Sequence, residues 1–376
     1  MTFRATTAQM YAATLWLRTA TRVMVRLAEF PARTFGELET RAATIRWSAV
    51  VAPGAAVRFK VTARLSSLYH EGAIAERLGA ACVAAVPDAH ILEGGEDDGD
   101  ARDDAQLFIV RVLHDSFTLS ADCAGALLHR RGYRLAGGKA PLRETLAATL
   151  LLAAGYDGSA PLVDPLCGSG TIPIEAAMIA RRIAPGLKRS FAFERWPSFE
   201  AATWQTVRAD AESLVLPAAP HVIAGSDRDR GVIASAVANA ERAGVAAHVA
   251  FACAAISEAP IPAAARGFLV TNPPYGVRIG DRTALGHLFA QLGRVARVQC
   301  AGWSVTLLSA HTSYEWQMRL PLVEEALISN GGLRLRLVHA GSAGSAQPRS
   351  SRTAQANTAS HKPDRRTAGL SGRRRF

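Results

Sequence analysis

The sequence lacks long hydrophobic runs and paired cysteines, and each absence excludes a class of protein. No stretch of eighteen apolar residues occurs, and the amino-terminal residues show no signal-peptide pattern, which argues against a membrane-spanning or secreted chain. The five cysteines show no C-x-x-C pairing and no zinc spacing. We therefore expect a protein of the reduced cytoplasm that holds no metal ion.

A glycine-rich turn between a strand and a helix is the first candidate binding loop. Residues 161–163 predict a short buried strand and residues 172–180 the start of a helix, with Gly168 and Gly170 between them. Glycine permits a tight turn and a close approach of backbone to ligand. The pattern G-x-G-x-x-G is absent, and Asp164 precedes the turn; an acid there repels pyrophosphate but suits a cationic sulfonium or ammonium group. Taken alone, the turn is also compatible with a plain strand-to-helix connection, which is the less favoured interpretation.

A second acid follows the next predicted strand. Residues 222–226 are apolar and end at Asp227, before a helical run over residues 232–244. An acid at this place accepts hydrogen bonds from ribose hydroxyls. Asp227 lies 63 residues (227 − 164) after Asp164, against about 20 in a minimal unit, so we expect an insertion over residues 181–217. Its aromatic residues are interpreted as packing rather than as a base-stacking surface; they are Phe191, Phe193, Trp196, Phe199 and Trp204.

The tetrapeptide Asn272-Pro273-Pro274-Tyr275 is the second candidate site. It stops the predicted buried strand 267–271, because proline cannot donate to a sheet ladder. The Asn272 amide oxygen and the Pro273 carbonyl are two acceptors for one NH₂ group. Bonding both hydrogens aims the nitrogen lone pair at a methyl donor, and Tyr275 can stack on the base. The alternative for the tetrapeptide alone is a rigid turn with an Asn cap. No cysteine follows the prolines, which argues against a covalent C5-pyrimidine mechanism.

The two clusters in this order predict transfer of a methyl group to an exocyclic base nitrogen. Residues 128–280 resemble the catalytic half of bacterial THUMP-domain class I methyltransferases, the group that modifies guanine N2 in RNA. The matching segments are 129–134, 139–146, 164–171 and 271–280. The resemblance extends over about residues 10–340. It implies S-adenosylmethionine as methyl donor and a structured RNA as acceptor, with 23S ribosomal RNA favoured over transfer RNA.

The resemblance and the motifs together assign the site residues. The catalytic group is the tetrapeptide from Asn272 to Tyr275. The predicted cofactor-binding residues are Pro141, Leu142, Thr145, Asp164, Cys167, Gly168, Ser169, Gly170, Thr171 and Asp227. In the family the segment 141–145 lines the methionine end of the cofactor pocket, and Cys167 is interpreted as a packing residue rather than a nucleophile. Many class I enzymes place an acid after the third strand to hold adenine. Residues 251–255 contain none, so backbone groups are expected to hold it.

The amino-terminal third predicts an α/β module without a glycine-rich loop, which resembles a THUMP RNA-binding module. Its predicted elements are strands over 22–30 and 56–63, helices over 35–45 and 68–85, and a hairpin of 107–112 with 117–121. The predicted RNA contacts are Arg58, Lys60, Arg64, Arg131, Tyr133 and Arg134. Arginines on the outer face of a strand are often only solvated. The segment around Tyr133 is also compatible with closing over the cofactor or with an ordinary hinge.

The predicted fold is α/β, with a Rossmann-like class I methyltransferase sheet preceded by a smaller α+β THUMP module. We divide the chain into a partial ferredoxin-like subdomain (1–34), a THUMP-like domain (35–124), a linker (125–138), a methyltransferase domain (139–340) and a basic tail (341–376). In the family an additional strand and helix usually precede the part that begins at Met1. The carboxyl-terminal part predicts a strand over 303–308, a helix over 314–328 and a last, antiparallel strand over 333–338.

Charge is distributed unevenly along the chain. The formal net charge is +11, and residues 341–376 hold eight basic residues against one acid, which leaves +4 for the rest. This tail is rich in Ser, Ala, Gly and Arg without periodicity, which predicts disorder and either non-specific contact with RNA phosphates or simple solvation. The acidic stretch 93–104 is interpreted as a solvated insertion rather than a metal site.

Three alternatives to guanine-N2 methylation of ribosomal RNA remain open from the sequence. The same clamp serves N6 of adenine, and the acceptor can be a transfer RNA. The missing acid in residues 251–255 also motivates a non-catalytic RNA-binding or ribosome-assembly factor, although Asp164, Asp227 and Asn272 argue against a decayed site.

Overall fold

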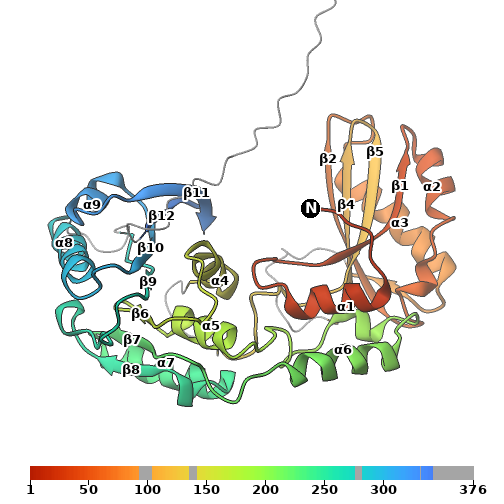
Figure 1. Ribbon diagram of the computed structural model, residues 1–376. Coiled ribbons are helices and arrows are strands. Elements are labelled where there is room, and N and C mark those ends of the chain that lie inside the picture. Colours follow the sequence, from red (N-terminus) through yellow and green to blue (C-terminus); the bar gives the residue numbers. More distant parts are fainter. Residues whose placement is uncertain (93–103, 135–141, 276–281, 331, 342–376) are drawn as a thin grey trace, which may run out of the picture.

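The computed structural model describes residues 1–92, 104–134, 142–275, 282–330 and 332–341. Pro141, the end of the linker, nearly all of the acidic stretch and all but the first residue of the basic tail therefore lie outside the described residues. The described chain forms two sheets, each in its own part of the molecule (Figure 1). Within these residues no helix is both long and apolar enough to cross a bilayer.

The amino-terminal module is built on a five-stranded sheet of order β1-β5-β4-β2-β3. Its elements are β1 (Met24–Pro31), α2 (Phe35–Ala42), β2 (Ala56–Arg64), α3 (Glu71–Ala85), β3 (His90–Ile91), β4 (Gln106–Leu113) and β5 (Ser116–Asp122). These elements confirm the predicted strands, helices and hairpin. Strand β1 pairs with β5 along most of its length, so the boundary drawn at residue 34 falls within one sheet.

Helix α1 (Thr7–Trp16) joins this module to the insertion of the second part, which contains α6 (Ala201–Ser213). The Tyr11 ring stacks on Phe193 with centroids 4.4 Å apart, and Trp204 packs edge-on against both rings. The Tyr11 hydroxyl also accepts a hydrogen bond from the Glu200 amide at 3.0 Å. The packing role predicted for the insertion aromatics is confirmed, because Phe191, Phe193, Trp196 and Trp204 are buried in the core of the amino-terminal module.

The second part is a seven-stranded sheet of order β11-β12-β10-β9-β6-β7-β8. Its strands are β6 (Leu162–Asp164), β7 (Ile223–Asp227), β8 (Ala250–Cys253), β9 (Phe268–Thr271), β10 (Ser304–Ser309), β11 (Val323–Asn330) and β12 (Leu333–Ala340). Its α-helices are α4 (Glu144–Ala153), α5 (Thr171–Ala180), α7 (Arg230–Ala243), α8 (Arg282–Val298) and α9 (Thr312–Gln317). The 3₁₀ turns of the described residues are η1 (Trp47–Ala49), η2 (Ala192–Arg195), η3 (Ala246–His248) and η4 (Ile256–Glu258).

The order of the parallel strands places a reversal between β6 and β9. From β6 the chain proceeds through β7 to β8 on one side, and then returns to β9 and β10 on the other. In open α/β sheets, ligands bind outside the carboxyl ends of the strands at such a reversal. The fold therefore predicts a ligand site at the residues that end or follow β6, β7 and β9.

The predicted helix over residues 314–328 is wrong. Helix α9 ends at Gln317, and residues 323–330 form β11, which pairs antiparallel with β12. Pro321 disfavours helical backbone at the residue before it, and Arg319 has a left-handed φ of 52°. The predicted antiparallel strand over residues 333–338 is confirmed as β12, although β11 rather than β12 is the edge strand.

Helices α8 and α9 approach so closely at Gly293 that a methyl group does not fit. A Cβ at this position would lie 2.2 Å from the Met318 carbonyl oxygen and 2.4 Å from its Cα. We expect Gly293→Ala to destabilise the fold by about 1–3 kcal/mol, because backbone must move. Gly286→Ala on the same helix is the control, since no atom of the described chain lies within 4 Å of that Cβ; it should stabilise by up to about 1 kcal/mol. Urea unfolding of both variants checks this, and equal effects would contradict it.

Candidate functional site

Three predicted segments meet at the carboxyl edge of the seven-stranded sheet. Asp164 ends β6, Asp227 ends β7, and Asn272 directly follows β9. Val163 lies opposite Leu269 in the β6–β9 register, while β7 borders the other side of β6. The structure therefore brings the glycine turn, the second acid and the proline tetrapeptide together at the reversal of the sheet.

The glycine turn has backbone conformations and packing that require glycine. Gly168 and Gly170 have φ angles of 52° and 84°, in the left-handed region. A Cβ on Gly170 would lie 3.0 Å from both the Ala236 Cβ and the Phe251 ring, so the turn packs tightly against α7 and β8. At Gly168, by contrast, no described atom lies within 4 Å of the added Cβ. The turn thus exposes backbone to open space beside the start of α5.

Asp164 is buried beneath this turn with a relative exposure of 1%. One of its carboxyl oxygens accepts hydrogen bonds from the Thr271 hydroxyl at 2.6 Å and from the Leu166 amide at 3.1 Å. Burial raises the pKa of Asp164 to about 7, an effect that the Thr271 and Leu166 hydrogen bonds oppose and the nearby Asp227 charge adds to. The carboxyl group therefore titrates near neutral pH, and a cation placed beside it would favour the ionised form.

Asp227 connects the end of β7 to the glycine turn. Its two carboxylate oxygens accept hydrogen bonds from the Gly168 amide at 3.2 Å and from the Asp229 amide at 3.0 Å. A carboxylate offers about four acceptor positions, so each oxygen retains capacity for a further donor. Asp227 is only half-buried. Its geometry is compatible with the predicted role as acceptor for two ribose hydroxyls.

The proline tetrapeptide follows the end of β9, with Pro273 buried and the other three residues half-buried. The Tyr275 hydroxyl donates a hydrogen bond to the Asn272 amide oxygen at 2.5 Å. Burial raises the pKa of Tyr275, although hydrogen bonds to Asn330 and Asn272 act in the opposite direction. The ring is therefore a neutral phenol whose hydroxyl contacts the acceptor that the predicted mechanism requires.

Cys167 and Ser169 are held by the residues around the turn. The Cys167 amide donates to the Ser226 carbonyl at 2.9 Å, and the Asn239 side chain donates to the Ser169 carbonyl at 3.0 Å. Burial, with the charges of Asp164 and Asp227, raises the pKa of the Cys167 thiol far above its usual range. A neutral buried thiol is a poor nucleophile, which supports the packing interpretation of this residue.

Arg134 joins the two halves of the predicted cofactor site instead of facing solvent. One nitrogen of its guanidinium donates both to the Leu142 carbonyl at 3.0 Å and to the Thr171 hydroxyl, and its Nε lies 3.5 Å from Glu144. Leu142 and Thr171, predicted separately as cofactor residues, are therefore neighbours. Thr145, on the first turn of α4, is buried. Because the Arg134 side chain is directed inward, the structure does not support it as an RNA contact.

Arg131 and Tyr133, also predicted to bind RNA, are 3% and 2% exposed. The Tyr133 hydroxyl donates to Glu175 of α5 at 3.2 Å, and the Arg131 and Arg18 guanidinium groups lie 3.5 and 3.7 Å from the same carboxylate. This corrects the expectation that both residues bind RNA, because both side chains contact Glu175 inside the protein. The basic linker is thus part of the junction between the two parts of the chain.

Several residues of this region were not predicted. Thr271 holds Asp164, Asn239 holds the glycine turn, and Glu175 collects the charges of the linker. Two of these residues could have been noticed in the sequence, namely Asn239 in α7 and Glu175 in α5. Each is a polar residue on the apolar side of a helix, and such a residue needs a partner. Their partners are distant in sequence and could not be identified from it.

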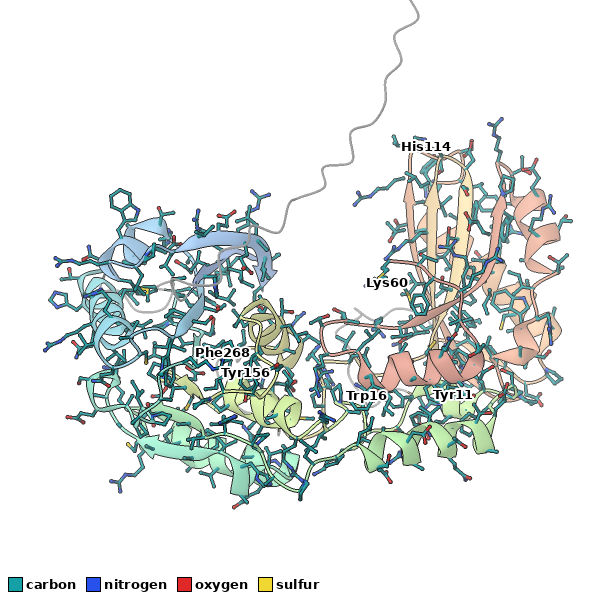
Figure 2. The ribbon with its side chains drawn as sticks, viewed as in Figure 1. Tyr11, Trp16, Lys60, His114, Tyr156 and Phe268 are labelled. Atoms are coloured by element: carbon teal, nitrogen blue, oxygen red, sulfur yellow. The ribbon has the colours of Figure 1, made fainter. Side chains whose placement is uncertain are left out.

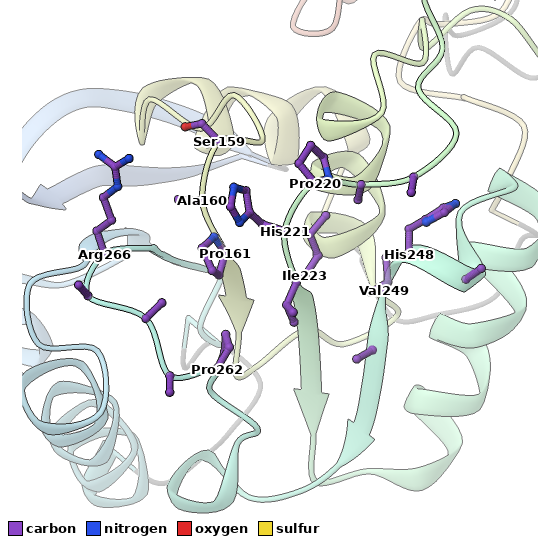
Figure 3. Close-up of a pocket in the computed structure, with 18 residues that line it drawn as sticks. Ser159, Ala160, Pro161, Pro220, His221, Ile223, His248, Val249, Pro262 and Arg266 are labelled. Carbon is purple, nitrogen blue, oxygen red and sulfur yellow. The ribbon is translucent and has the colours of Figure 1, made fainter.

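The pocket in Figure 3 lies at the opposite edge of the same sheet. Pro161, Val222, Val249 and Arg266, which line it, precede β6, β7, β8 and β9. It is therefore separated from Asp164, Asp227 and Asn272 by the length of the strands, and it takes no part in the site described above.

Residues 131–338 match the family description "RMKL-like, methyltransferase domain". The chain belongs to this methyltransferase family. It is 34% identical to the ribosomal RNA large subunit methyltransferase K/L of Shewanella sp. (strain ANA-3), over 88% of this chain and 47% of that protein. A Synechocystis sp. protein, provisionally named an RNA methyltransferase, is 32% identical over 88% of this chain and 85% of its own length.

A solved structure supports the same assignment. A provisionally named methyltransferase, crystallised with SAH, superposes with a TM-score of 0.75 at 30% identity, over 89% of this chain and 87% of its own. The predicted class I methyltransferase fold is thereby confirmed. The chain spans only about a third to a half of the large-subunit K/L relatives that it matches. An RMKL-like methyltransferase domain thus accounts for the sheet and its site, while the acceptor substrate needs a separate argument.

Proposed function

We propose that this chain transfers a methyl group from S-adenosylmethionine to the exocyclic N2 of a guanine in 23S ribosomal RNA. The observation that carries the proposal is the meeting of Asp164, Asp227 and Asn272 at the reversal of a methyltransferase sheet. Ribosomal RNA is favoured by the names of the large-subunit K/L relatives. The proposed compartment is the cytoplasm, where that RNA is made in bacteria.

The residues present fit S-adenosylmethionine. Asp227 retains acceptor capacity for ribose hydroxyls beyond its two backbone hydrogen bonds. The open space beside Gly168 permits backbone to approach the ligand, and Asp164 suits its positive charge. We assign the methionine end to Leu142 and Thr145, with Thr171 beside them. When bound, the cofactor supplies an electrophilic methyl group.

The tetrapeptide prepares the acceptor nitrogen. The Asn272 amide oxygen and the Pro273 carbonyl accept the two hydrogens of the target amino group, which directs its lone pair out of the base plane. The Tyr275 ring stacks on the extruded base, as enzymes that act on single bases require. The hydrogen bonds from the amino group to Asn272 and Pro273 become stronger as the amino nitrogen gains positive charge. They therefore stabilise the transition state more than the ground state.

We infer that residues 35–124 act as a THUMP-like RNA-binding module. Strand β2 directs Val57 and Val61 into the core beneath α2 and α3, while Lys60 and Arg64 are exposed. Figure 2 shows Lys60 on the side of the module that is turned toward the methyltransferase domain. Arg58 is half-buried, and it lies on the same face of β2 as Lys60 and Arg64 because side chains alternate along a strand. RNA bound on this face would therefore lie on the side of the module that is turned toward the methyltransferase domain.

Removing two of these charges should weaken RNA binding through counterion release. We expect the double change Lys60→Ala and Arg64→Ala to make the slope of log affinity against log salt shallower by about 1–2, since each phosphate contact contributes about 0.7–0.9. Arg41→Ala, an exposed arginine on the helical side of the module, is the control. Filter binding across a salt series gives the slopes, and parallel lines for all three proteins would contradict the prediction.

Mass spectrometry of nucleosides tests the proposed reaction. Purified protein, S-adenosylmethionine and unmodified 23S RNA fragments should produce N2-methylguanosine at one position. N6-methyladenosine would instead establish the adenine alternative, and modification of transfer RNA alone would replace the proposed substrate. Absence of cofactor binding at millimolar concentration would leave only a non-catalytic RNA-binding protein.

A further inference from the structure

A polar groove with a volume of about 590 Å³ lies between α8 and α9. Its α8 residues follow one another at intervals of four, four and three positions, which places them on one face of the helix; they are Thr283, His287, Gln291 and Arg294. The lining also includes the small residues Gly286 and Ala290. A Cβ on Gly286 would meet no atom of the described chain within 4 Å. The groove is therefore open along this face of α8.

Packing between the two helices holds the walls of the groove in place. The Phe289 and Tyr314 rings stack with their centroids 5.4 Å apart. The Arg297 guanidinium donates a hydrogen bond to the Met318 carbonyl, and the close approach at Gly293 fixes α8 against the same residue. The groove is thus formed before a ligand binds, which reduces the free energy that binding must spend on ordering it.

The side chains of the groove suit an anionic ligand. Neither Asp nor Glu occurs among the described residues that line it, while Arg294 and His287 are exposed there. Within the described chain, neither of these two side chains has a hydrogen-bond or ion-pair partner. Glu315, the acid of α9, is buried and lies 3.0 Å from Arg336 of β12. The Arg294 guanidinium is therefore available to a phosphate, which it can bind through two parallel N–H groups.

One end of the groove lies beside the acceptor site. Strands β9 and β10 are parallel neighbours, so their carboxyl ends lie at the same edge of the sheet. The tetrapeptide follows β9, and α9 begins three residues after β10 ends (312 − 309). From this edge the groove runs along α8 to Arg294, about 17 Å from Thr283 at a rise of 1.5 Å per residue. An enzyme that extrudes a base also contacts the flanking nucleotides, and the groove begins where those nucleotides would lie.

We propose that the α8–α9 groove binds the single-stranded RNA segment that flanks the target nucleotide. Arg294 binds a phosphate of this segment, and His287 and Tyr314 supply rings against which a base or a ribose packs. The amides of Gln291 and Gln317 are donors and acceptors for base edges and 2′-hydroxyls. The inference rests on the proposed function. It gives the methyltransferase domain an RNA contact of its own, separate from the amino-terminal module.

Removing the two basic side chains of the groove should weaken RNA binding. We expect the double change His287→Ala and Arg294→Ala to lower the affinity for the methylated 23S RNA fragment by roughly 10-fold or more, the effect of a lost charge-assisted hydrogen bond. The slope of log affinity against log salt should become shallower by about 0.7. The matched control is the double change His221→Ala and Arg266→Ala, which removes the same residue types from exposed positions at the opposite edge of the sheet.

Filter binding across a salt series measures both double variants. The control should bind RNA as the wild type does, and both variants should keep the wild-type melting temperature and affinity for S-adenosylmethionine. Equal RNA affinities of the two double variants would overturn the proposal. These measurements need no methyl transfer. Lack of N2-methylguanosine from the wild-type protein would therefore contradict the proposed function and leave the groove to be decided by binding.

Filling the groove tests it without a change of charge. Gly286→Leu places a bulky side chain in the open space and should lower RNA affinity by roughly 5-fold or more, because ligand atoms are excluded. Gly286→Ala adds a single methyl group and should bind RNA nearly as the wild type does. Melting temperatures show whether both variants fold. Wild-type RNA affinity of a folded Gly286→Leu variant would show that RNA does not enter the groove.

Photochemical cross-linking identifies the occupant of the groove. Benzoylphenylalanine placed at Gln291 should cross-link to a nucleotide within a few positions of the methylated base, whichever base that is. The same group placed at Ala264, in the pocket at the opposite edge, should give no RNA cross-link. Cross-links from Gln291 to distant nucleotides, or to protein in place of RNA in a cell extract, would overturn the proposal.

Discussion

Asn272→Ala is expected to lower methyl transfer by roughly a hundredfold or more, while the affinity for S-adenosylmethionine changes little. Loss of a contact that matters mainly in the transition state has an effect of this size. Asn272 follows β9, whereas the predicted cofactor residues lie at or after the ends of β6 and β7 or around the start of α4. The change should therefore affect the acceptor nitrogen and leave the cofactor contacts in place.

Single-turnover rates at saturating RNA, with calorimetric binding of the cofactor, check this prediction. Asn272→Asp is the matched comparison, because it retains an acceptor oxygen at the same distance from the backbone and should lose less activity than the alanine variant. Near-normal turnover of Asn272→Ala would exclude the proposed clamp. Equal loss of cofactor affinity and of rate would show that Asn272 belongs to the cofactor site.

The parts of the site that sequence predicts are those carried by short segments at strand ends. Asp164, Asp227 and Asn272 each follow an apolar run, and parallel strands bring their carboxyl ends to one edge. The glycine turn was predictable for a similar reason, because its two left-handed residues are both glycine. The local sequence pattern and the general rule for parallel sheets indicate the same place. These residues could therefore be assigned to one site from the sequence alone.

The junction between the two parts of the chain could not be predicted in this way. Arg131 and Tyr133 have the composition of an exposed RNA-binding segment, yet Glu175, more than forty residues away, receives both side chains. Sequence shows a charge but not whether its partner is a phosphate or a distant carboxylate. The wrong prediction of a helix over residues 314–328 has a related cause. The local pattern of this segment is ambiguous, and its pairing with β12 makes residues 323–330 a strand.

Asp164→Asn is expected to stabilise the protein at neutral pH and to weaken the cofactor. The carboxyl group is 1% exposed, and burial raises its pKa to about 7. Below about pH 4 the group is protonated in both the folded and the unfolded chain. Between about pH 4 and 7 only the unfolded chain is ionised, so wild-type stability falls as pH rises and levels off above pH 7.

Asparagine at position 164 does not titrate, and its oxygen can still accept from the Thr271 hydroxyl and the Leu166 amide. The free energy of unfolding of the variant should therefore rise relative to wild type by roughly 1–3 kcal/mol between pH 5 and pH 8. Urea unfolding at four pH values measures the difference. Asp210→Asn, exposed on α6, controls for loss of one carboxylate, and a difference that does not vary with pH would contradict the burial argument.

The same titration should appear in cofactor binding. A cationic ligand favours the ionised Asp164, so below pH 7 wild-type affinity for S-adenosylmethionine should fall by up to about tenfold per pH unit. The Asp164→Asn variant should bind weakly at every pH and lack this dependence. Calorimetry at pH 6 and pH 8 compares the two proteins. Equal affinities, or the same pH profile in both, would show that the cation does not lie beside Asp164, and the assignment of Asp164 to the positive charge of the cofactor would then fail.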